Sequence, residues 1–143
     1  MSLDEIHAAI PHREPFLLVD EIVQCDERHI VCLKTFRQDE WWVRGHYPHF
    51  PLIPGVLLCE AAMQAGGVLL SQIAHPPPGS VPVVTRMADV RFKSMVRPGD
   101  TILMEVRLIE RLGGAFFFSA QVTSGGRIAV RFQFACTLTE PQG

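Results

Sequence analysis

A single acidic residue, Glu60, interrupts the longest apolar run of the sequence, Leu52–Leu70. If this run is helical, the positions three or four residues away are apolar apart from Gln64: Val56, Leu57 and Met63. A carboxylate in such surroundings needs a partner, or its pKa rises until the group is neutral. A carboxyl group that is protonated near neutral pH can act as a general acid. The alternative is a solvated glutamate on the outer face of the helix.

His46 is the second candidate, in the segment Gly45-His46-Tyr47-Pro48, whose Gly and Pro favour a non-helical backbone. Histidine titrates near neutrality and can serve as a base at working pH. An ordinary structural or surface histidine is the alternative, because the chain has five others: His7, His12, His29, His49 and His75.

The start of the apolar helix offers a third group. Pro54 is favoured in a first helical turn, so the helix can begin there and leave the N–H groups of Gly55 and Val56 free. Such N–H groups form a partly positive site for an oxygen that carries negative charge. A base, an acid and a carbonyl-polarising donor together suggest proton abstraction next to a carbonyl with loss of a neighbouring hydroxyl. Prolines between His46 and the helix prevent any placement of His46 from helical spacing.

Metal and cofactor chemistry find little support in the sequence. His46 and His49 form an HxxH pair, but Pro48 lies between them and no third ligand beyond Glu60 is evident. The chain has no glycine-rich phosphate loop and no dinucleotide-binding fingerprint. We therefore expect neither a metal nor a cofactor.

Composition describes a globular chain of 143 residues, long enough for one domain over residues 1–143. Apolar residues make up 48% and charged residues 20%, which excludes a disordered tail, a collagen-like repeat and a disulfide mini-scaffold. A formal net charge of -2 argues against a general nucleic-acid binder. Residues 86–143 nevertheless carry 8 Lys and Arg against 5 Asp and Glu, a balance of +3 that suggests an acidic partner.

The sequence also indicates a compartment. Four cysteines without a CxxC pair favour free thiols in the cytosol, and residues 1–7 do not resemble a signal peptide. The run Leu52–Leu70 has nearly the length of a membrane span, but it contains Pro54, Glu60 and Gln64. We expect a helix buried in a cytoplasmic protein and no membrane span.

Beyond the helix, which we predict over Pro54–Ile73, the pattern changes to the period of two that is typical of strands. Three long strands are predicted with glycine pairs between them: Thr101–Leu108, Ala115–Thr123 and Ile128–Leu138. Two earlier ones are predicted at Phe16–Cys25 and His29–Arg37. The fold class is α+β, with one long antiparallel sheet wrapped around one central helix.

Several motifs resemble the (3R)-3-hydroxyacyl-[acyl carrier protein] dehydratases of the FabZ type. They are Pro11-His12-Arg13-Glu14-Pro15-Phe16-Leu17-Leu18-Val19-Asp20, Gly45-His46-Tyr47-Pro48 with the following 51–61, Val90-Arg91-Phe92-Lys93 and Arg97-Pro98-Gly99-Asp100. The motifs are in order over about residues 6–138. The resemblance implies the hot-dog fold and dehydration of a carrier-bound 3-hydroxyacyl chain in fatty acid biosynthesis.

The resemblance also implies residue roles. His46 takes the α-proton, Glu60 helps the 3-hydroxyl to leave, and the N–H of Gly55, with Val56 beside it, binds the thioester carbonyl. In this family the histidine and the glutamate meet across a homodimer, and trimers of such dimers are common. Glu60, where a related isomerising branch has Asp, favours dehydration alone. The partner is an acyl carrier protein with a phosphopantetheine-linked acyl chain.

Some residues depart from the family pattern. If Arg86 or Trp42 lines the acyl tunnel, the accepted chain length changes. A basic rim for the acidic carrier protein is one interpretation of Arg86, Arg91, Lys93, Arg97 and Arg111, and a solvated strand face is the other. Two rival functions stay open: a hot-dog acyl thioesterase and a non-catalytic acyl-binding protein.

Overall fold

The computed structural model describes residues 3–46 and 49–139 of the chain. In these residues it has two α-helices, α1 (Leu3–Ala9) and α2 (Gly55–Ala74), and a 3-10 helix η1 (Val43–Gly45). The six strands are β1 (Glu21–Cys25), β2 (His29–Thr35), β3 (Pro82–Phe92), β4 (Thr101–Leu112), β5 (Ala115–Ser124) and β6 (Arg127–Leu138). They form one antiparallel sheet in the order β1-β2-β4-β5-β6-β3.

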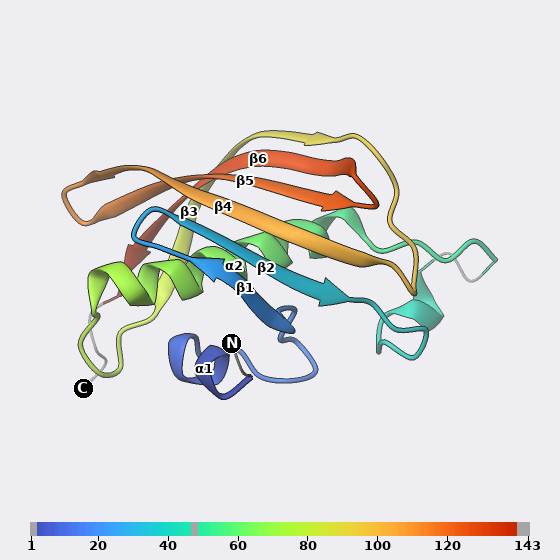
Figure 1. The fold of residues 1–143 in the computed structure, drawn as a ribbon, viewed down its shortest axis with the longest axis horizontal. Helices are drawn as coiled ribbons and strands as arrows, with labels where there is room; N and C mark the ends of the chain where they lie inside the picture. The colour runs from blue at the N-terminus through green and yellow to red at the C-terminus, as the bar shows by residue number, and fades with distance from the viewer. Residues whose placement is uncertain (1–2, 47–48, 140–143) are drawn as a thin grey trace.

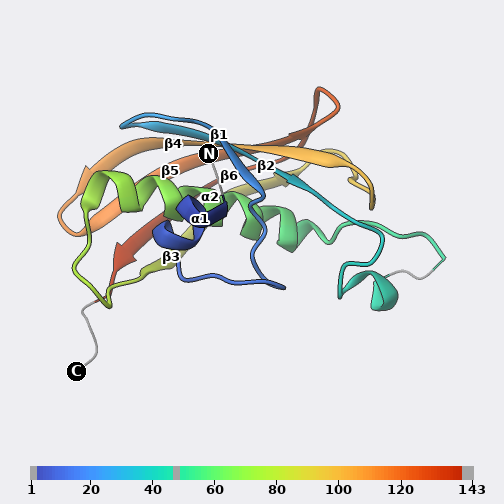
Figure 2. The same ribbon diagram turned by 60° about the horizontal axis from the view of Figure 1, so that its bottom comes forward.

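The sheet lies over α2, and α1 lies on the other side of this helix (Figures 1 and 2). The predicted α+β hot-dog architecture is therefore confirmed. The three C-terminal strands form the predicted meander, and their bounds differ from the expected ones by a few residues at most.

Alternation along the strands places the core between the sheet and α2. Phe116 and Phe118 of β5 and Phe132 and Phe134 of β6 are buried. Small residues of α2 allow the sheet to approach, since a Cβ on Gly66 would lie 2.6 Å from Cζ of Phe134. This close packing fixes the helix under the centre of the sheet.

Helix α2 is the one helix among residues 3–46 and 49–139 that is long and apolar enough to cross a membrane by length and composition. Within that apolar window, 61% is buried inside the fold. Core helices pass the same length and composition test, so this burial agrees with the prediction of a helix buried in the protein.

The segment Phe16–Asp20 is not a strand, contrary to the prediction that a strand begins at Phe16. Leu17, Leu18 and Val19 are buried consecutively instead of alternating. The reason is that the segment runs along α2, where the backbone N–H of Leu18 bonds to a side chain of the helix. Only β1, from Glu21, joins the sheet.

Strand β3 is at one edge of the sheet and pairs only with β6 within the described residues. It is 11 residues long, and its residues are exposed or half-exposed throughout. Many of them are apolar: Val83, Val84, Met87, Val90 and Phe92. A long apolar edge strand of this kind presents unpaired backbone groups to any further strand.

Candidate active site

His46 lies in a cleft of about 350 Å³ at the N-terminal end of α2. Gly55, Val56, Phe92 and Met95 line the same cleft. His46 follows η1, where its backbone N–H donates to the carbonyl of Val43 over 3.3 Å. The structure thus brings together three of the four predicted site residues. Tyr47 and Pro48 of the predicted motif lie outside the described residues.

The first turn of α2 leaves two N–H groups without a helical acceptor. The helical hydrogen bonds begin with the N–H groups of Leu57 and Leu58, which donate to the carbonyl of Pro54 over 2.9 and 3.3 Å. The N–H groups of Gly55 and Val56 precede them. Both residues line the cleft, and the helix dipole favours negative charge at this end of α2.

Phe92, at the end of β3, packs over the backbone of Gly55. A Cβ added at Gly55 would lie 2.5 Å from Cε1 of the Phe92 ring. Glycine at this position therefore lets the aromatic ring close one wall of the cleft directly against the helix start.

Glu60 is not among the residues that line this cleft. Its carboxylate is about three-quarters buried and accepts a hydrogen bond from Nε2 of Gln64 over 3.0 Å. Nε2 of His12 lies 3.6 Å from the same oxygen, Oε2. Glu60 is therefore neither a solvated outer-face residue nor unpartnered: two polar side chains hold it.

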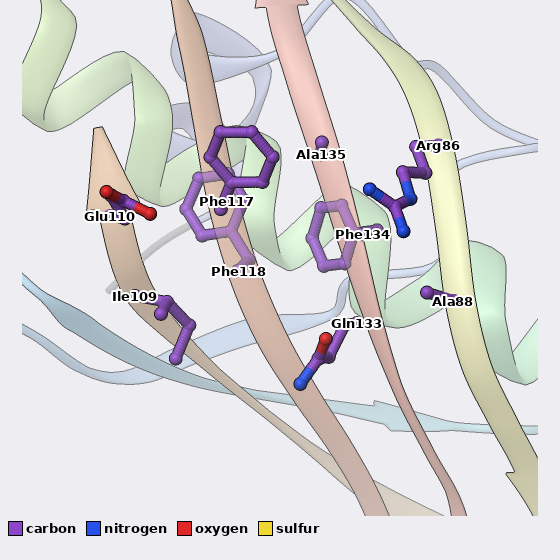
Figure 3. A pocket seen from close by; sticks show the side chains of 9 residues that line it. All are labelled: Arg86, Ala88, Ile109, Glu110, Phe117, Phe118, Gln133, Phe134 and Ala135. Atoms are coloured by element: carbon purple, nitrogen blue, oxygen red, sulfur yellow. The ribbon is translucent and has the colours of Figure 1, made fainter. Parts of the chain in front are cut away.

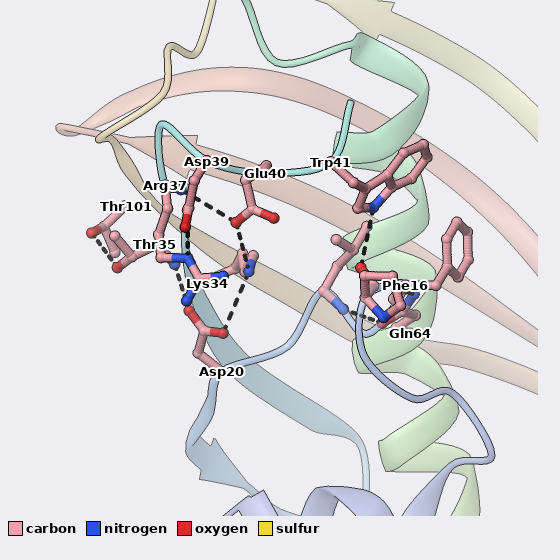
Figure 4. A network of polar contacts seen from close by, with 12 residues as sticks. Phe16, Asp20, Lys34, Thr35, Arg37, Asp39, Glu40, Trp41, Gln64 and Thr101 are labelled. Atoms are coloured by element: carbon pink, nitrogen blue, oxygen red, sulfur yellow. Dashed lines mark hydrogen bonds and ion pairs between the residues drawn. The ribbon is translucent and has the colours of Figure 1, made fainter. Parts of the chain in front are cut away.

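Gln64 in turn is fixed by the chain that runs beside α2. Its Oε1 accepts from the N–H of Leu18 over 2.7 Å, and its Nε2 donates to the carbonyl of Phe16 over 2.9 Å (Figure 4). Gln64 is almost fully buried. The amide thus joins the carboxylate of Glu60 to the backbone of Phe16–Leu18.

The sequence analysis missed the roles of His12 and Gln64. Gln64 had a signal, because it is the one polar residue a helical turn from Glu60. His12 had none of its own, since it lies in an irregular segment where no periodicity applies. Nδ1 of His12 is buried and has no hydrogen-bond partner among the described residues.

Cys59 precedes Glu60 but is not a candidate nucleophile. Burial raises the pKa of its thiol to about 11. The thiolate is the reactive form of cysteine, so this thiol is inert at neutral pH.

Arg86 lines a groove on the outer face of the sheet, with Glu110, Phe117 and Gln133 (Figure 3). It is not among the residues that line the His46 cleft, and neither is Trp42, which is buried edge-on against Phe36. Within one chain, neither residue therefore narrows the cleft.

The five basic residues of the expected rim are exposed but have separate surroundings. The guanidinium of Arg97 lies 4.8 Å from the ring centroid of Phe50, whereas that of Arg111 lies 4.6 Å from that of Phe116. Arg86 belongs to the outer groove.

Across residues 3–46 and 49–139, no group of three or more His, Cys, Asp or Glu is placed to hold a metal ion.

Comparisons with known proteins give the family. Residues 10–133 match the model of the FabA-like domain. The chain belongs to the FabA-like family. It is 40% identical over 129 residues to the 3-hydroxyacyl-[acyl-carrier-protein] dehydratase FabZ of Clostridium perfringens, covering 90% of this chain and 92% of that protein.

A FabZ of Streptococcus pyogenes is 39% identical over 139 residues, covering 95% of this chain and 99% of that protein. Among solved structures, the dehydratase heterocomplex ApeI:P from Xenorhabdus doucetiae is similar with a TM-score of 0.77 at 16% identity, over 94% of this chain and 91% of that one. At this identity the structural similarity supports the hot-dog fold, and the FabA-like assignment rests on the sequence matches.

Proposed function

We infer that this chain is a 3-hydroxyacyl-[acyl carrier protein] dehydratase of fatty acid biosynthesis. It removes water from a 3-hydroxyacyl thioester and gives the trans-2-enoyl thioester. The observation that supports this best is the cleft that His46 lines together with Gly55 and Val56, the first two residues of α2. FabZ relatives about 40% identical over nine-tenths of the chain support the same activity.

In the proposed mechanism the thioester carbonyl accepts hydrogen bonds from the N–H of Gly55, with Val56 beside it. Polarisation of the carbonyl acidifies the neighbouring carbon, and the imidazole of His46 takes the α-proton. The bond between C3 and the hydroxyl breaks as the carboxylic acid of Glu60 donates a proton, so that water leaves. Return of the proton from His46 to Glu60 restores both groups.

The proposal includes a homodimer with shared sites. Within one chain Glu60 is outside the His46 cleft, so a complete site needs Glu60 from a second copy. The exposed edge of β3 offers the surface on which two copies can join their sheets. A trimer of dimers is a further step of assembly that this proposal allows.

The substrate partner we propose is an acyl carrier protein with a phosphopantetheine-linked acyl chain, in the cytoplasm. Support for a docking surface comes from the exposed basic residues, in particular Arg97, which stacks on Phe50 in the segment that leads from His46 to α2. No metal or cofactor enters the proposed reaction.

The decisive experiment follows the absorbance of the enoyl group with carrier-protein thioesters of four to sixteen carbons. The wild-type chain is compared with Glu60→Gln and His46→Ala. We expect turnover in the wild type and a loss of about 10²-fold or more in each variant. A folded dimer without turnover at any length, or a His46→Ala variant with undiminished dehydration, would contradict the assignment. Hydrolysis of the thioester instead of dehydration would identify a thioesterase.

A further inference from the structure

Three charged residues form a cluster where the end of β2 meets the loop that leads to His46 (Figure 4). We call Asp20, Lys34 and Glu40 the anchor cluster. Nζ of Lys34 lies 3.2 Å from Oε1 of Glu40 and 3.6 Å from Oδ1 of Asp20. Lys34 is only 8% exposed and Glu40 only 7%. A buried ion pair tolerates little displacement, because separating the charges leaves each of them desolvated.

One side of the anchor cluster is connected to His46 by a series of hydrogen bonds. Oε1 of Glu40 accepts a hydrogen bond from the N–H of Arg37 over 3.2 Å, which turns the loop back on itself. The carbonyl of Glu40 accepts from Val43 over 3.1 Å, and the carbonyl of Val43 accepts from His46 over 3.3 Å. Glu40 is thus held through its carboxylate by Lys34 and Arg37, and its backbone carbonyl begins the hydrogen bonds that lead to η1 and His46.

The other side connects to the segment that holds Glu60. Oδ2 of Asp20 accepts from the N–H of Thr35 over 2.8 Å, and Leu18, two residues before Asp20, donates to Gln64 over 2.7 Å. Gln64 then donates to Glu60 over 3.0 Å.

A second contact joins the same two parts of the chain. Nε1 of Trp41, next to Glu40, donates to the carbonyl of Pro15 over 3.2 Å (Figure 4). The loop that leads to His46 and the segment beside Glu60 are thus joined twice, by the ion pairs of Lys34 with Asp20 and Glu40 and by the hydrogen bond from Trp41 to Pro15.

We propose that the buried Lys34–Glu40 pair, with Asp20, is a positioning element that fixes the His46 loop against the segment supporting Glu60. In the shared dimer it thereby sets the position of His46 in one active site and of Glu60 in the other. The inference rests on the proposed dehydratase function. A buried ion pair stabilises a fold little more than apolar residues of similar shape would. The contribution of the Lys34–Glu40 pair is therefore to fix the positions of the segments it joins. A catalytic group displaced by about 1 Å can lose about 10² in rate.

The test replaces the pair by apolar residues of similar size, Lys34→Met with Glu40→Leu, so that no charge is left buried alone. Turnover of a 3-hydroxybutyryl thioester on acyl carrier protein is measured together with thermal unfolding. We expect kcat to fall about 10- to 100-fold with little change in KM or in the unfolding midpoint. The imidazole NMR signal of His46, assigned through its loss in His46→Ala, should shift in the folded double variant.

The matched control is Arg37→Ala with Asp39→Ala, which removes an exposed ion pair of 3.1 Å from the same loop. This variant should keep its kcat and its His46 signal. A folded Lys34→Met/Glu40→Leu variant with kcat within about twofold of the wild type would overturn the inference. Absence of turnover in the wild type would instead overturn the proposed function.

If the double variant does not fold, Glu40→Gln decides the question. Asp20 still lies beside Lys34 in that variant, and the amide can still accept from Arg37. A lower kcat at an unchanged unfolding midpoint supports the positioning role, and an unchanged kcat refutes it.

Discussion

Gln64 illustrates how one side chain on a core helix can serve several polar groups at once. Its amide satisfies the N–H of Leu18 and the carbonyl of Phe16 and also donates to Glu60. Two of these partners are backbone groups of the segment Phe16–Asp20, which is not part of any strand. The position of the Glu60 carboxylate therefore depends on how well that segment is held in place.

Replacement of Gln64 by Met should damage both stability and turnover. Leu18 and Phe16 would lose buried hydrogen bonds, so we expect the free energy of unfolding to fall by about 1–3 kcal/mol. Turnover should fall as well, because Glu60 loses the group that orients it. Urea unfolding and kcat measure the two effects. Gln72→Met, at an exposed position of the same helix, is the control and should change neither quantity.

The chemical types of the site residues were predictable from the sequence, whereas their distances were not. Glu60 stood out because a carboxylate is unusual in an apolar helix, and His46 because its neighbours exclude a helix. Residues that meet through an irregular chain, such as His12 and Glu60, carry no sequence signal, since no period relates their positions. The proposed origin of Glu60 and His46 from different copies also lies beyond any spacing argument.

Buried thiols give a pH dependence of stability. Burial raises the pKa of Cys32 and Cys136 from 9.0 to about 12, and that of Cys59 to about 11. Above pH 9 the unfolded chain releases these protons while the folded chain keeps them. The stability due to the raised pKa values is therefore fully present below pH 9 and is lost as pH rises towards 11–12.

We expect the urea midpoint to fall steadily from pH 9 upward, and the three thiols to resist alkylation at pH 8 until the chain is unfolded. A Cys32→Val variant should show a shallower alkaline slope. Cys25 is only half-buried and is scored separately. Rapid alkylation of Cys32, Cys59 or Cys136 in the folded chain at pH 8 would contradict the burial of these thiols.

At the scale of elements, the period of the sequence predicted α2 and the strands that bury one face, whereas it predicted neither α1 nor β3. β5 and β6 each bury one face against α2, so period two is visible in their residues. Phe16–Asp20 consists of consecutive buried residues, and composition alone did not distinguish it from a strand. β3 is exposed on both faces, so buried and exposed residues do not alternate along it. The period of two that marks a half-buried strand is therefore missing.

The contact between α2 and β6 predicts the effect of Gly66→Ala. Alanine has a helix propensity about 1 kcal/mol better than glycine, but its Cβ would lie 2.6 Å from the Phe134 ring. Overlap in a close-packed core costs about 1–3 kcal/mol, so we expect a net loss of stability. Thermal unfolding measures it. Adding Phe134→Leu should restore part of the loss in Gly66→Ala, while Gly114→Ala, with no atom near its Cβ, should be tolerated.

For the whole molecule, the proposed sharing of sites predicts complementation between inactive chains. In a dimer of one His46→Ala chain and one Glu60→Gln chain, one site has both defects and the other has neither. If subunits mix at random, half of the dimers are of this kind, so activity should recover to about a quarter of the wild-type value.

The measurement is turnover after the two variants are unfolded together and refolded at equal concentrations. Each variant refolded alone is the control and should stay inactive. No recovery in a mixture shown by mass spectrometry to contain mixed dimers would mean that each site is built from one chain.

The position of β3 in the sheet also affects how the chain is made. Among residues 3–46 and 49–139, β3 bonds only to β6, the last of the six strands. On a ribosome β3 therefore emerges more than thirty residues before its partner begins at Arg127. Chains are synthesised from the N-terminus at about 5–20 residues per second, so an apolar strand waits unpaired for seconds. Premature termination before Arg127 would leave that strand permanently unpaired, and we expect such fragments to be removed by chaperones and proteases or to aggregate.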